Sequence, residues 1–244
     1  MGRVALVTGA SGGIGGSAAC LLAREGFAVA LAYHTHEPEA QKLAAQLCRE
    51  GLESAVFRAD ISDPKQVNEM VERVQKRYGF IDTLVNNAGI AGQALFTEIT
   101  QEEWHRMFAV HVDGAFYCTQ AVLPEMIRRK TGVIINVSSI WGMVGASCEV
   151  HYSAAKAALI GLTKALAKEV GPSGIRVNCV APGVIDTAMS GVLDEQTLLS
   201  LREETPLGMI GSPDDAAAAI AFFASDRARF ITGQVLSPNG GFVI

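Results

Sequence analysis

Tyr152 and Lys156 lie four residues apart in the segment His151–Val170, whose apolar residues recur at helical spacing. Residues four apart on a helix share a face, so we expect the two side chains one turn from each other. A lysine ammonium beside a phenol favours the phenolate, and we expect Lys156 to lower the pKa of Tyr152. The pair then suits acid–base chemistry on an oxygen. Taken alone, the spacing equally describes a surface tyrosine beside a snorkelling lysine.

Ser139 is a third polar residue whose position suits catalysis. It directly follows Gly132–Ser138, a run of β-branched and aliphatic residues that predicts a buried strand. In a parallel sheet, ligands bind at the carboxyl ends of the strands, so we expect Ser139 beside the helix that carries Tyr152. There its hydroxyl can hydrogen-bond a substrate carbonyl.

A glycine-rich turn, Thr8-Gly-Ala-Ser-Gly-Gly-Ile-Gly15, separates the predicted strand Val4–Thr8 from the predicted helix Gly15–Arg24. Glycines there let the backbone approach a pyrophosphate, whose charge the free N–H groups and the helix dipole stabilise. An ordinary glycine-rich turn has a similar composition, but the position of this turn in the first strand-to-helix connection favours dinucleotide binding. We expect the cofactor to be lined by Gly9, Ser11, Gly12, Gly13, Ile14 and Gly15.

The end of the second predicted strand bears on the choice between NAD and NADP. An acidic residue there would bind the ribose hydroxyls of NAD and repel a 2′-phosphate. The segment reads Tyr33-His34-Thr35-His36 and has no acid. We therefore expect NADP(H) to be favoured over NAD(H), with Tyr33 and His34 near the cofactor. No arginine or lysine of this segment adds to that preference, and a solvated loop explains either histidine alone.

These residues depend on elements that alternate regularly along the chain. The predicted strands are Val4–Thr8, Ala28–Tyr33, Ser54–Arg58, Thr83–Asn86, Gly132–Ser138, Arg176–Pro182 and Val235–Ser237. The predicted helices are Gly15–Arg24, Glu37–Glu50, Pro64–Tyr78, Glu102–Arg128, His151–Val170 and Pro213–Ala224. This pattern predicts an α/β fold: a single-domain Rossmann fold over residues 1–244, with a doubly wound seven-stranded parallel sheet and helices on both faces.

The composition excludes several other classes of protein. The 244 residues carry a net charge of −5, which lacks the basic excess that nucleic-acid binding requires. The five cysteines are dispersed without metal-ligand spacing, so we expect no metal site. No apolar stretch is long enough to cross a membrane, and the first strand begins too early for a signal peptide, which predicts a cytoplasmic protein. Only 18% of residues are charged, which predicts a homo-oligomer.

Taken together, the motifs resemble those of the short-chain dehydrogenase/reductase family over nearly the whole chain. They are the Thr8–Gly15 turn, Asp60, Asn86-Asn87-Ala88-Gly89, Ser139, the Tyr152/Lys156 pair and Pro182-Gly183. The resemblance implies a metal-free oxidoreductase in which Tyr152 protonates a ketone oxygen, Ser139 orients it, and a hydride comes from the nicotinamide. It implies that Lys156 binds the nicotinamide ribose. The further cofactor residues that it implies are Asp60, Ile61, Asn87, Ala88, Gly89, Pro182, Gly183, Ile185 and Thr187.

Within that family the chain looks most like the 3-oxoacyl-[acyl-carrier-protein] reductases. The segments Leu84–Gly89, Ile175–Asn178 and Ile231–Gln234 carry this likeness. It implies an NADPH-dependent reduction of a ketone on an acyl carrier protein in fatty acid biosynthesis. It also implies a homotetramer, joined through the helices Glu102–Arg128 and His151–Val170, with Gly240–Ile244 near another interface.

Three positions depart from the reductase pattern. His111 stands where the family has a catalytic asparagine, and it can keep that residue's role or add a titrating group. Gly12 replaces the arginine that usually meets the 2′-phosphate. For carrier-protein binding, Arg129 and Lys130 supply one of the two basic positions, whereas Ser173 occupies the other, with Arg176 nearby as a substitute.

A fourth departure is the segment Ile140–His151 between the catalytic serine and tyrosine. We expect Trp141 to narrow the substrate pocket, and Glu149, where glutamine is common, to attract an ammonium group. The segment resembles a bacterial subfamily that reduces the 5-aminopentanone modification on elongation factor P. A core-filling role for Trp141 and a solvated surface position for Glu149 are equally consistent with the sequence.

Three functions follow as alternatives. The chain reduces a ketone tethered to a carrier or target protein with NADPH, oxidises a secondary alcohol with NAD, or binds a dinucleotide without catalysis. The missing acid after the second strand disfavours the NAD-dependent alcohol dehydrogenase. A dinucleotide-binding protein of this kind that has lost its catalytic activity usually lacks the tyrosine or the lysine, and here both Tyr152 and Lys156 are present. We expect the loop from Met189 to Pro206 to be the substrate lid, because it follows the Pro182-Gly183 turn.

Overall fold

Runs of aliphatic and β-branched residues form one seven-stranded sheet in the computed structural model, which describes residues 2–187 and 195–244. The strands are β1 (Arg3–Thr8), β2 (Phe27–Tyr33), β3 (Ser54–Arg58), β4 (Thr83–Asn86), β5 (Gly132–Val137), β6 (Ile175–Val180) and β7 (Val235–Leu236). Their order is β3-β2-β1-β4-β5-β6-β7, and all neighbours are parallel. The chain winds outward in both directions from β1, which confirms the predicted doubly wound sheet.

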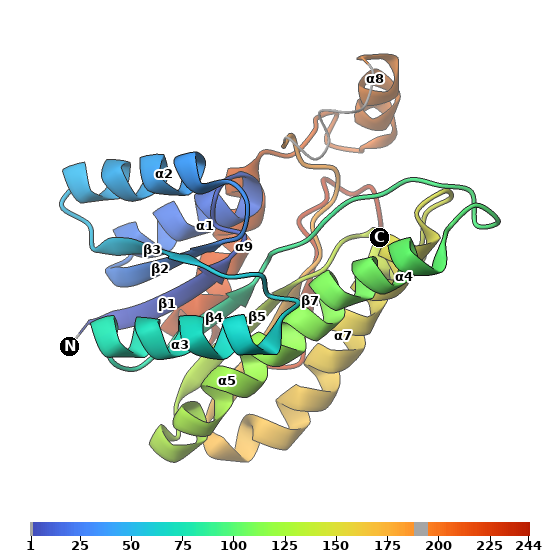
Figure 1. Cartoon of the computed structure of the whole chain (residues 1–244). Coiled ribbons are helices and arrows are strands. Elements are labelled where there is room, and N and C mark those ends of the chain that lie inside the picture. The colour runs from blue at the N-terminus through green and yellow to red at the C-terminus, as the bar shows by residue number, and fades with distance from the viewer. Residues whose placement is uncertain (1, 188–194) are drawn as a thin grey trace.

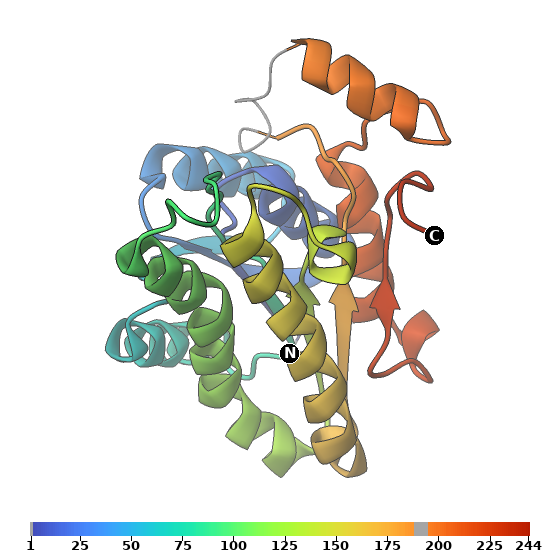
Figure 2. The ribbon, with the colours of Figure 1, turned by 90° about the vertical axis from the view of Figure 1, so that its right-hand side faces the viewer.

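Helices cover both faces of the sheet (Figures 1 and 2). On one face lie α1 (Gly13–Arg24), α2 (Glu37–Arg49) and α9 (Pro213–Ala224), and on the other lie α3 (Pro64–Tyr78), α5 (Gly114–Arg129) and α7 (Val150–Val170). Alternate residues of β1 point to the two sides, with Leu6 in one core and Val7 in the other. This arrangement confirms the α/β fold.

The prediction of one continuous helix from Glu102 to Arg128 is wrong. It divides into α4 (Gln101–Phe108), the π-helical turn η1 (Ala109–Asp113) and α5. The π-turn holds one residue more per turn than an α-helix and changes the direction in which His111 points. Apolar residues still recur every three or four positions across the turn, so the periodicity does not reveal the break.

Two other helices were not predicted from the sequence. The single turn α6 (Trp141–Val144) follows β5, and α8 (Glu195–Glu204) stands away from the sheet at the top of Figure 1. Residues 189–194 of the expected lid lie outside the described residues, and the rest of that loop is mainly α8. Short 3-10 turns complete the fold at η2 (Gly171–Ser173) and η3 (Asp226–Ala228). Among the residues in the described ranges, no helix is long and apolar enough to span a membrane.

Four buried polar side chains fix the helices that carry the site against the sheet. The Asn86 amide on β4 donates to Asn136 Oδ1 on β5 (2.9 Å) and to Thr119 Oγ1 on α5 (3.1 Å). The Asn136 amide donates in turn to Thr163 Oγ1 on α7 (2.9 Å). Because buried polar groups without partners are costly, this chain of bonds permits few alternative positions for α5 and α7.

Candidate active site

Ser139, Tyr152 and Lys156 lie together at the carboxyl end of β5. Ser139 follows the strand and is buried, and its hydroxyl lies close enough to the half-buried phenol of Tyr152, at the start of α7, to act on the phenol's pKa. Lys156 follows one turn later, with its Nζ 5.6 Å from the centre of the Tyr152 ring. Ser138 Oγ also donates to the Lys156 carbonyl (2.8 Å), which ties α7 to the end of β5. The structure thus brings the three residues together.

The electrostatics of the pair differ from the sequence prediction. Lys156 is only 4% exposed, its Nζ donates to the Val137 carbonyl (2.8 Å), and burial lowers its pKa to about 8. Burial raises the pKa of Tyr152 to about 12, and the Glu149 charge adds to the rise, while the hydrogen bond from Ser139 opposes it. The expectation that Lys156 lowers the pKa of Tyr152 is therefore wrong for this arrangement, because desolvation of the phenolate dominates.

His111 lies in the π-turn with its imidazole packed edge-on against Tyr152, the ring centres 5.4 Å apart. Its Nε2 is 3.0 Å from the Ile90 nitrogen and 2.8 Å from the Ile90 oxygen. A neutral imidazole nitrogen either accepts or donates, so His111 serves one of these groups at a time. Its Nδ1 is buried and has no hydrogen-bond partner among the described residues. An asparagine would supply both the acceptor and the donor.

We predict that His111→Asn keeps activity and makes the fold less sensitive to acid. Burial lowers the pKa of His111 from 6.5 to about 3, so between these values only the unfolded chain takes up the proton. Folding stability therefore falls as the pH falls below 6.5, by about 2 kcal/mol at pH 5. Thermal unfolding at pH 7 and pH 5 measures the difference. His105→Asn, on the exposed face of α4, is the control; an equal acid-induced loss in wild type and His111→Asn would contradict the prediction.

The glycine turn after β1 is shaped as a cradle for a pyrophosphate. Gly9 has a positive φ of 66°, and a Cβ there would lie 2.8 Å from the Ala88 Cα. A Cβ at Gly15 would collide with the Gly9 carbonyl and the Asn87 amide. Helix α1 then begins at Gly13, after the N-cap residue Gly12, with no side-chain cap and no acid in its first turn. Exposed N–H groups at a helix start and backbone that only glycine permits fit a dinucleotide phosphate.

Thr8 is a positioning residue to which the sequence reading gave no role. Its hydroxyl accepts hydrogen bonds from the backbone nitrogens of Asn87 (3.0 Å) and Ala88 (3.1 Å) and donates to the Val85 carbonyl (3.2 Å). The Asn87 amide donates back to the carbonyls of Thr8 (3.0 Å) and Gly9 (3.3 Å). Asn87 thus holds the glycine turn, and the only sequence signal for Thr8 is its place at the start of the motif.

The loop after β4 is fastened along its length to the catalytic elements. Asn87 binds the glycine turn, and Gly89 lies so close to His111 that a Cβ would collide with the imidazole. Farther along, the Gln93 amide donates to Glu149 Oε1 (3.2 Å), and the Ala94 nitrogen donates to the Cys148 carbonyl (2.9 Å). The loop therefore links the glycine turn, the π-turn and the segment before α7.

The expected adenine end contains Asp60, just after β3. Burial raises the pKa of its carboxyl, but two hydrogen bonds from Ser62, helped by His34 and Arg106, hold it below the ordinary value. His34 Nε2 and Arg106 Nη1 each lie 3.8 Å from Asp60 Oδ2. Ile61, the next residue, packs so closely on Gly114 of α5 that a Cβ there would lie 2.5 Å from the isoleucine Cδ1.

The residues expected near a 2′-phosphate do not gather at one point. Tyr33 is buried, His34 faces Asp60, and His36 Nδ1 pairs with the Thr35 hydroxyl (3.0 Å). Beside the glycine turn, a groove of about 420 Å³ runs between α1, α2 and the start of α9. Ser11, Gly12, Gly13 and, from α2, Lys42 line it.

The turn after β6 closes the other side of the expected cofactor site. The Pro182 carbonyl accepts from the Ile140 nitrogen (3.0 Å), and the Gly183 nitrogen donates to the Pro238 carbonyl (3.0 Å). Ile185 is buried and pairs with Gly211 in an isolated parallel bridge. Thr187 comes next to the glycine turn, because a Cβ at Gly13 would lie 3.5 Å from the threonine methyl. The structure thus brings the glycine turn and the segment Ile185–Thr187, both of which we expect near the cofactor phosphates, close to each other.

Trp141 and Glu149 lie near the catalytic hydroxyls. The backbone nitrogen of Trp141 donates to Ser139 Oγ (3.2 Å), and the Trp141 side chain is partly exposed. Glu149 is half-buried, accepts from Gln93, and acts electrostatically on Tyr152. Both therefore lie where a substrate would approach Tyr152, and neither is a remote surface or core residue.

The basic residues expected to meet a carrier protein are partly committed elsewhere. Arg129 Nε binds Glu125 Oε1 (2.7 Å) one turn earlier on α5. Arg176 Nη2 donates to the carbonyls of Phe223 (2.8 Å) and Ser225 (3.3 Å) at the end of α9, and burial lowers its pKa. Arg176 therefore stabilises a helix terminus, which argues against its expected role as a substitute surface cation.

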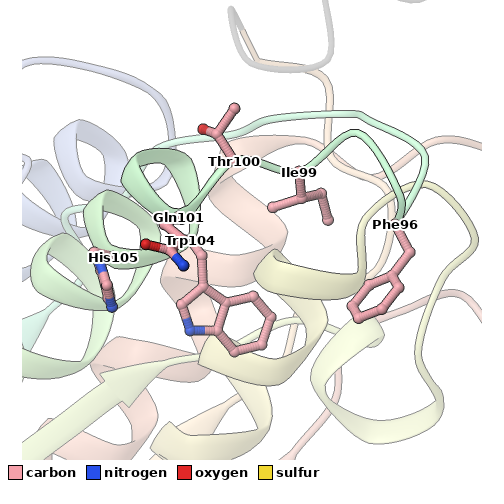
Figure 3. A pocket seen from close by; sticks show the side chains of 6 residues that line it. All are labelled: Phe96, Ile99, Thr100, Gln101, Trp104 and His105. Carbon is pink, nitrogen blue, oxygen red and sulfur yellow. The ribbon is translucent and has the colours of Figure 1, made fainter.

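A separate hollow of about 420 Å³ lies where the chain enters α4 (Figure 3). In this view the rings of Trp104 and Phe96 lie on either side of Ile99. None of its lining residues is among those expected to bind cofactor or substrate. In the described part of the chain, no three histidine, cysteine or acidic side chains come together as metal ligands.

Comparison with known proteins agrees with this geometry. A family model described as enoyl-(acyl carrier protein) reductase matches residues 9–243. The 3-oxoacyl-[acyl-carrier-protein] reductase FabG of Staphylococcus epidermidis is 41% identical over 241 residues, covering 99% of each chain. An uncharacterized oxidoreductase of Bacillus subtilis, YmfI, is 41% identical over 243 residues, also covering 99% of each. A solved gluconate 5-dehydrogenase from Burkholderia cenocepacia, in complex with NADP and tartrate, superposes with a TM-score of 0.94 at 34% identity, covering 98% of this chain and 94% of that one.

Proposed function

The chain belongs to the short-chain dehydrogenase/reductase family, an NAD(P)-dependent group of oxidoreductases, and from this we propose that it reduces a ketone to a secondary alcohol with NADPH. The proposed reaction is like that of a 3-oxoacyl-[acyl-carrier-protein] reductase. The observation that carries the proposal is the neighbouring pair of hydroxyls on Ser139 and Tyr152, with Lys156 one turn away. This pair and the glycine turn both follow the carboxyl ends of strands in the same parallel sheet.

In the proposed mechanism Tyr152 is the general acid. Its pKa of about 12 keeps the phenol protonated at neutral pH, so it has a proton to donate to the ketone oxygen. The Ser139 hydroxyl donates a hydrogen bond to the same oxygen and orients it. When bound, the nicotinamide supplies the hydride that adds to the carbonyl carbon. Lys156, whose Nζ lies 5.6 Å from the centre of the Tyr152 ring and whose pKa is about 8, binds the nicotinamide ribose in this proposal.

The cofactor in this proposal is held by residues from four loops and from α7. The glycine turn holds the pyrophosphate, and Asp60 holds the adenine. Asn87 to Gly89 and Lys156 bind on the side of the nicotinamide ribose, and Ile185 and Thr187 bind on the side of the carboxamide and phosphate. NADPH is preferred because the segment after β2, His34-Thr35-His36, has no acid that would repel a 2′-phosphate. The solved relative's complex with NADP supports this choice.

A paired kinetic assay tests the function. Acetoacetyl-coenzyme A and an amino-ketone are offered separately with NADPH or NADH, and oxidation of the nicotinamide is followed by absorbance. NADPH-dependent reduction of the thioester supports the acyl reductase, whereas a preference for NADH contradicts the cofactor proposal. Oxidation of a secondary alcohol with NAD as the only activity would favour the alternative alcohol dehydrogenase.

A second candidate substrate is the 5-aminopentanone group on elongation factor P, and Glu149 is the observation that favours it. Its carboxylate lies close enough to Tyr152 to raise the phenol's pKa, and it is half-buried. A carboxylate in such a position attracts an ammonium group and disfavours a long acyl chain. In either case we propose a ketone tethered to a protein, acted on by a homotetramer; Phe116 and Ile127 on α5 are exposed apolar residues suited to its contacts.

We predict that Glu149→Gln weakens reduction of cationic ketones selectively. The change removes the charge and keeps the size, so kcat/KM for the amino-ketone should fall about tenfold, while that for acetoacetyl-coenzyme A stays the same or rises. The ratio of the two kcat/KM values measures the effect. Glu102→Gln, an exposed acid on α4, is the matched control. An unchanged ratio in Glu149→Gln would rule out a role for this charge in substrate choice.

A further inference from the structure

The C-terminal segment, Ser237–Ile244, closes on itself around Asn239. The Asn239 amide donates to Ser237 Oγ (2.9 Å) and to the Val243 carbonyl (2.8 Å), and its Oδ1 accepts from the Gly241 nitrogen (2.7 Å). Gly240 and Gly241 have positive φ values of 64° and 90°, which permits the tight turn. The segment therefore has a defined shape and presents Phe242 in a fixed position.

This loop is attached to the turn after β6 that is expected to bind cofactor. Ser237 Oγ donates to the Ala181 carbonyl (2.7 Å), and the Pro238 carbonyl accepts from the Gly183 nitrogen (3.0 Å). A Cβ at Gly183 would lie 2.7 Å from the Asn239 Cα, so the two backbones touch. The loop is thus anchored to the same strand ends as the rest of the site.

Phe242 reaches from this loop to the substrate side of the site. Its ring meets Trp141 edge-to-face, with ring centres 5.8 Å apart and an interplanar angle of 84°. The backbone nitrogen of Trp141 donates to Ser139 Oγ, so the residue that carries this ring is attached to a catalytic hydroxyl. Both side chains remain partly exposed. Two perpendicular rings with exposed faces beside a reactive hydroxyl form an apolar corner.

We propose that Phe242 is a specificity-determining residue, which forms with Trp141 an aromatic corner for the hydrocarbon group beside the ketone. The inference rests on the proposed function and adds to it a class of substrate: ketones with an uncharged alkyl group next to the carbonyl. An anionic group in this corner would lose its hydration without gaining a partner, and so is disfavoured. A cationic group, where the substrate has one, belongs at Glu149 instead.

The kinetic test is Phe242→Ala. We expect KM for acetoacetyl-coenzyme A to rise about tenfold or more, because the corner loses one apolar wall, while the Kd of NADPH stays within about twofold. Phe242→Leu should restore most of the loss. Ile244→Ala, at a fully exposed terminal side chain, is the matched control. An unchanged KM, or a parallel loss of NADPH affinity, would overturn the proposal, since the latter marks a merely structural role.

A fluorescence test separates this proposal from the catalytic one. The chain has two tryptophans, and in Trp104→Phe the remaining Trp141 reports on the corner. Acetoacetyl-coenzyme A added to this variant with NADP⁺ should change the Trp141 emission, and Phe242→Ala in the same background should weaken the apparent affinity about tenfold. If acetoacetyl-coenzyme A changes the Trp141 emission in a manner that depends on Phe242, but the wild-type protein does not oxidise NADPH with this ketone, the proposed function fails and the aromatic corner stands. No emission change, or one independent of Phe242, would overturn the corner.

Discussion

Replacing Tyr152 by phenylalanine should lower kcat for ketone reduction at least about 10³-fold and leave NADPH binding unchanged. The substitution removes the proton donor and keeps the ring that packs against His111. Ser139 can still hydrogen-bond the ketone oxygen, but at neutral pH it is a far weaker acid than is needed to replace the phenol. Steady-state kinetics with NADPH, together with a fluorescence titration of the cofactor, measure the two quantities separately.

Tyr117→Phe is the matched control, because it removes the same atom from a half-buried tyrosine whose ring contacts Phe116 on α5 rather than the site. Its kcat should match that of wild type. Full activity in Tyr152→Phe would remove the general acid from the proposed mechanism. A large loss of NADPH affinity in the same variant would show instead that the phenol is needed to hold the cofactor.

Gly15→Ala should reduce kcat/KM for NADPH roughly 100-fold, because small displacements of a binding turn have effects of that size. The added methyl group would collide with the Gly9 carbonyl and the Asn87 amide, which are parts of the glycine turn itself. Neither can move alone, since the Asn87 amide is bonded to Thr8 and Gly9. A titration of NADPH fluorescence gives the affinity independently of turnover.

Gly16→Ala is the control for this change, on the same helix and one residue later. A Cβ at Gly16 would lie 3.7 Å from the Ala10 oxygen and from Leu43 Cδ2, which is ordinary contact distance. Alanine also has a higher helix propensity than glycine, so this variant should bind NADPH as wild type does and unfold at the same or a higher temperature. Equal affinities in the two variants would contradict the cradle described at Gly15.

Much of the fold follows from local sequence patterns. The five inner strands are buried from both faces, all seven read as short aliphatic runs, and five of the six predicted helices match observed ones within two residues. The meeting of Ser139 with Tyr152 and Lys156 also follows, because a strand end and a helical spacing of four are local features. The same holds for the place of the glycine turn between β1 and α1.

The rest depends on tertiary contacts that no local pattern records. The π-turn at His111 keeps the apolar spacing of a continuous helix, and the backbone hydrogen bond from Gly114 to the Ala109 carbonyl, five residues back, reveals it. The raised pKa of Tyr152 comes from burial by the whole site, which outweighs any effect of Lys156 along the helix. Phe242 is about a hundred residues from Trp141 in sequence, and their contact depends on the path of the C-terminal loop.

The loop after β4 also limits how such an enzyme can change over evolutionary time. It is bonded to the glycine turn through Asn87, to the π-turn through Ile90, and to the segment before α7 through Gln93 and Ala94. A residue inserted or deleted between Asn87 and Ala94 would shift at least one of these attachments out of register. New substrate preferences are therefore expected to arise by exchange of side chains at Gln93 and Glu149, with the length of this loop unchanged among descendants of different specificity.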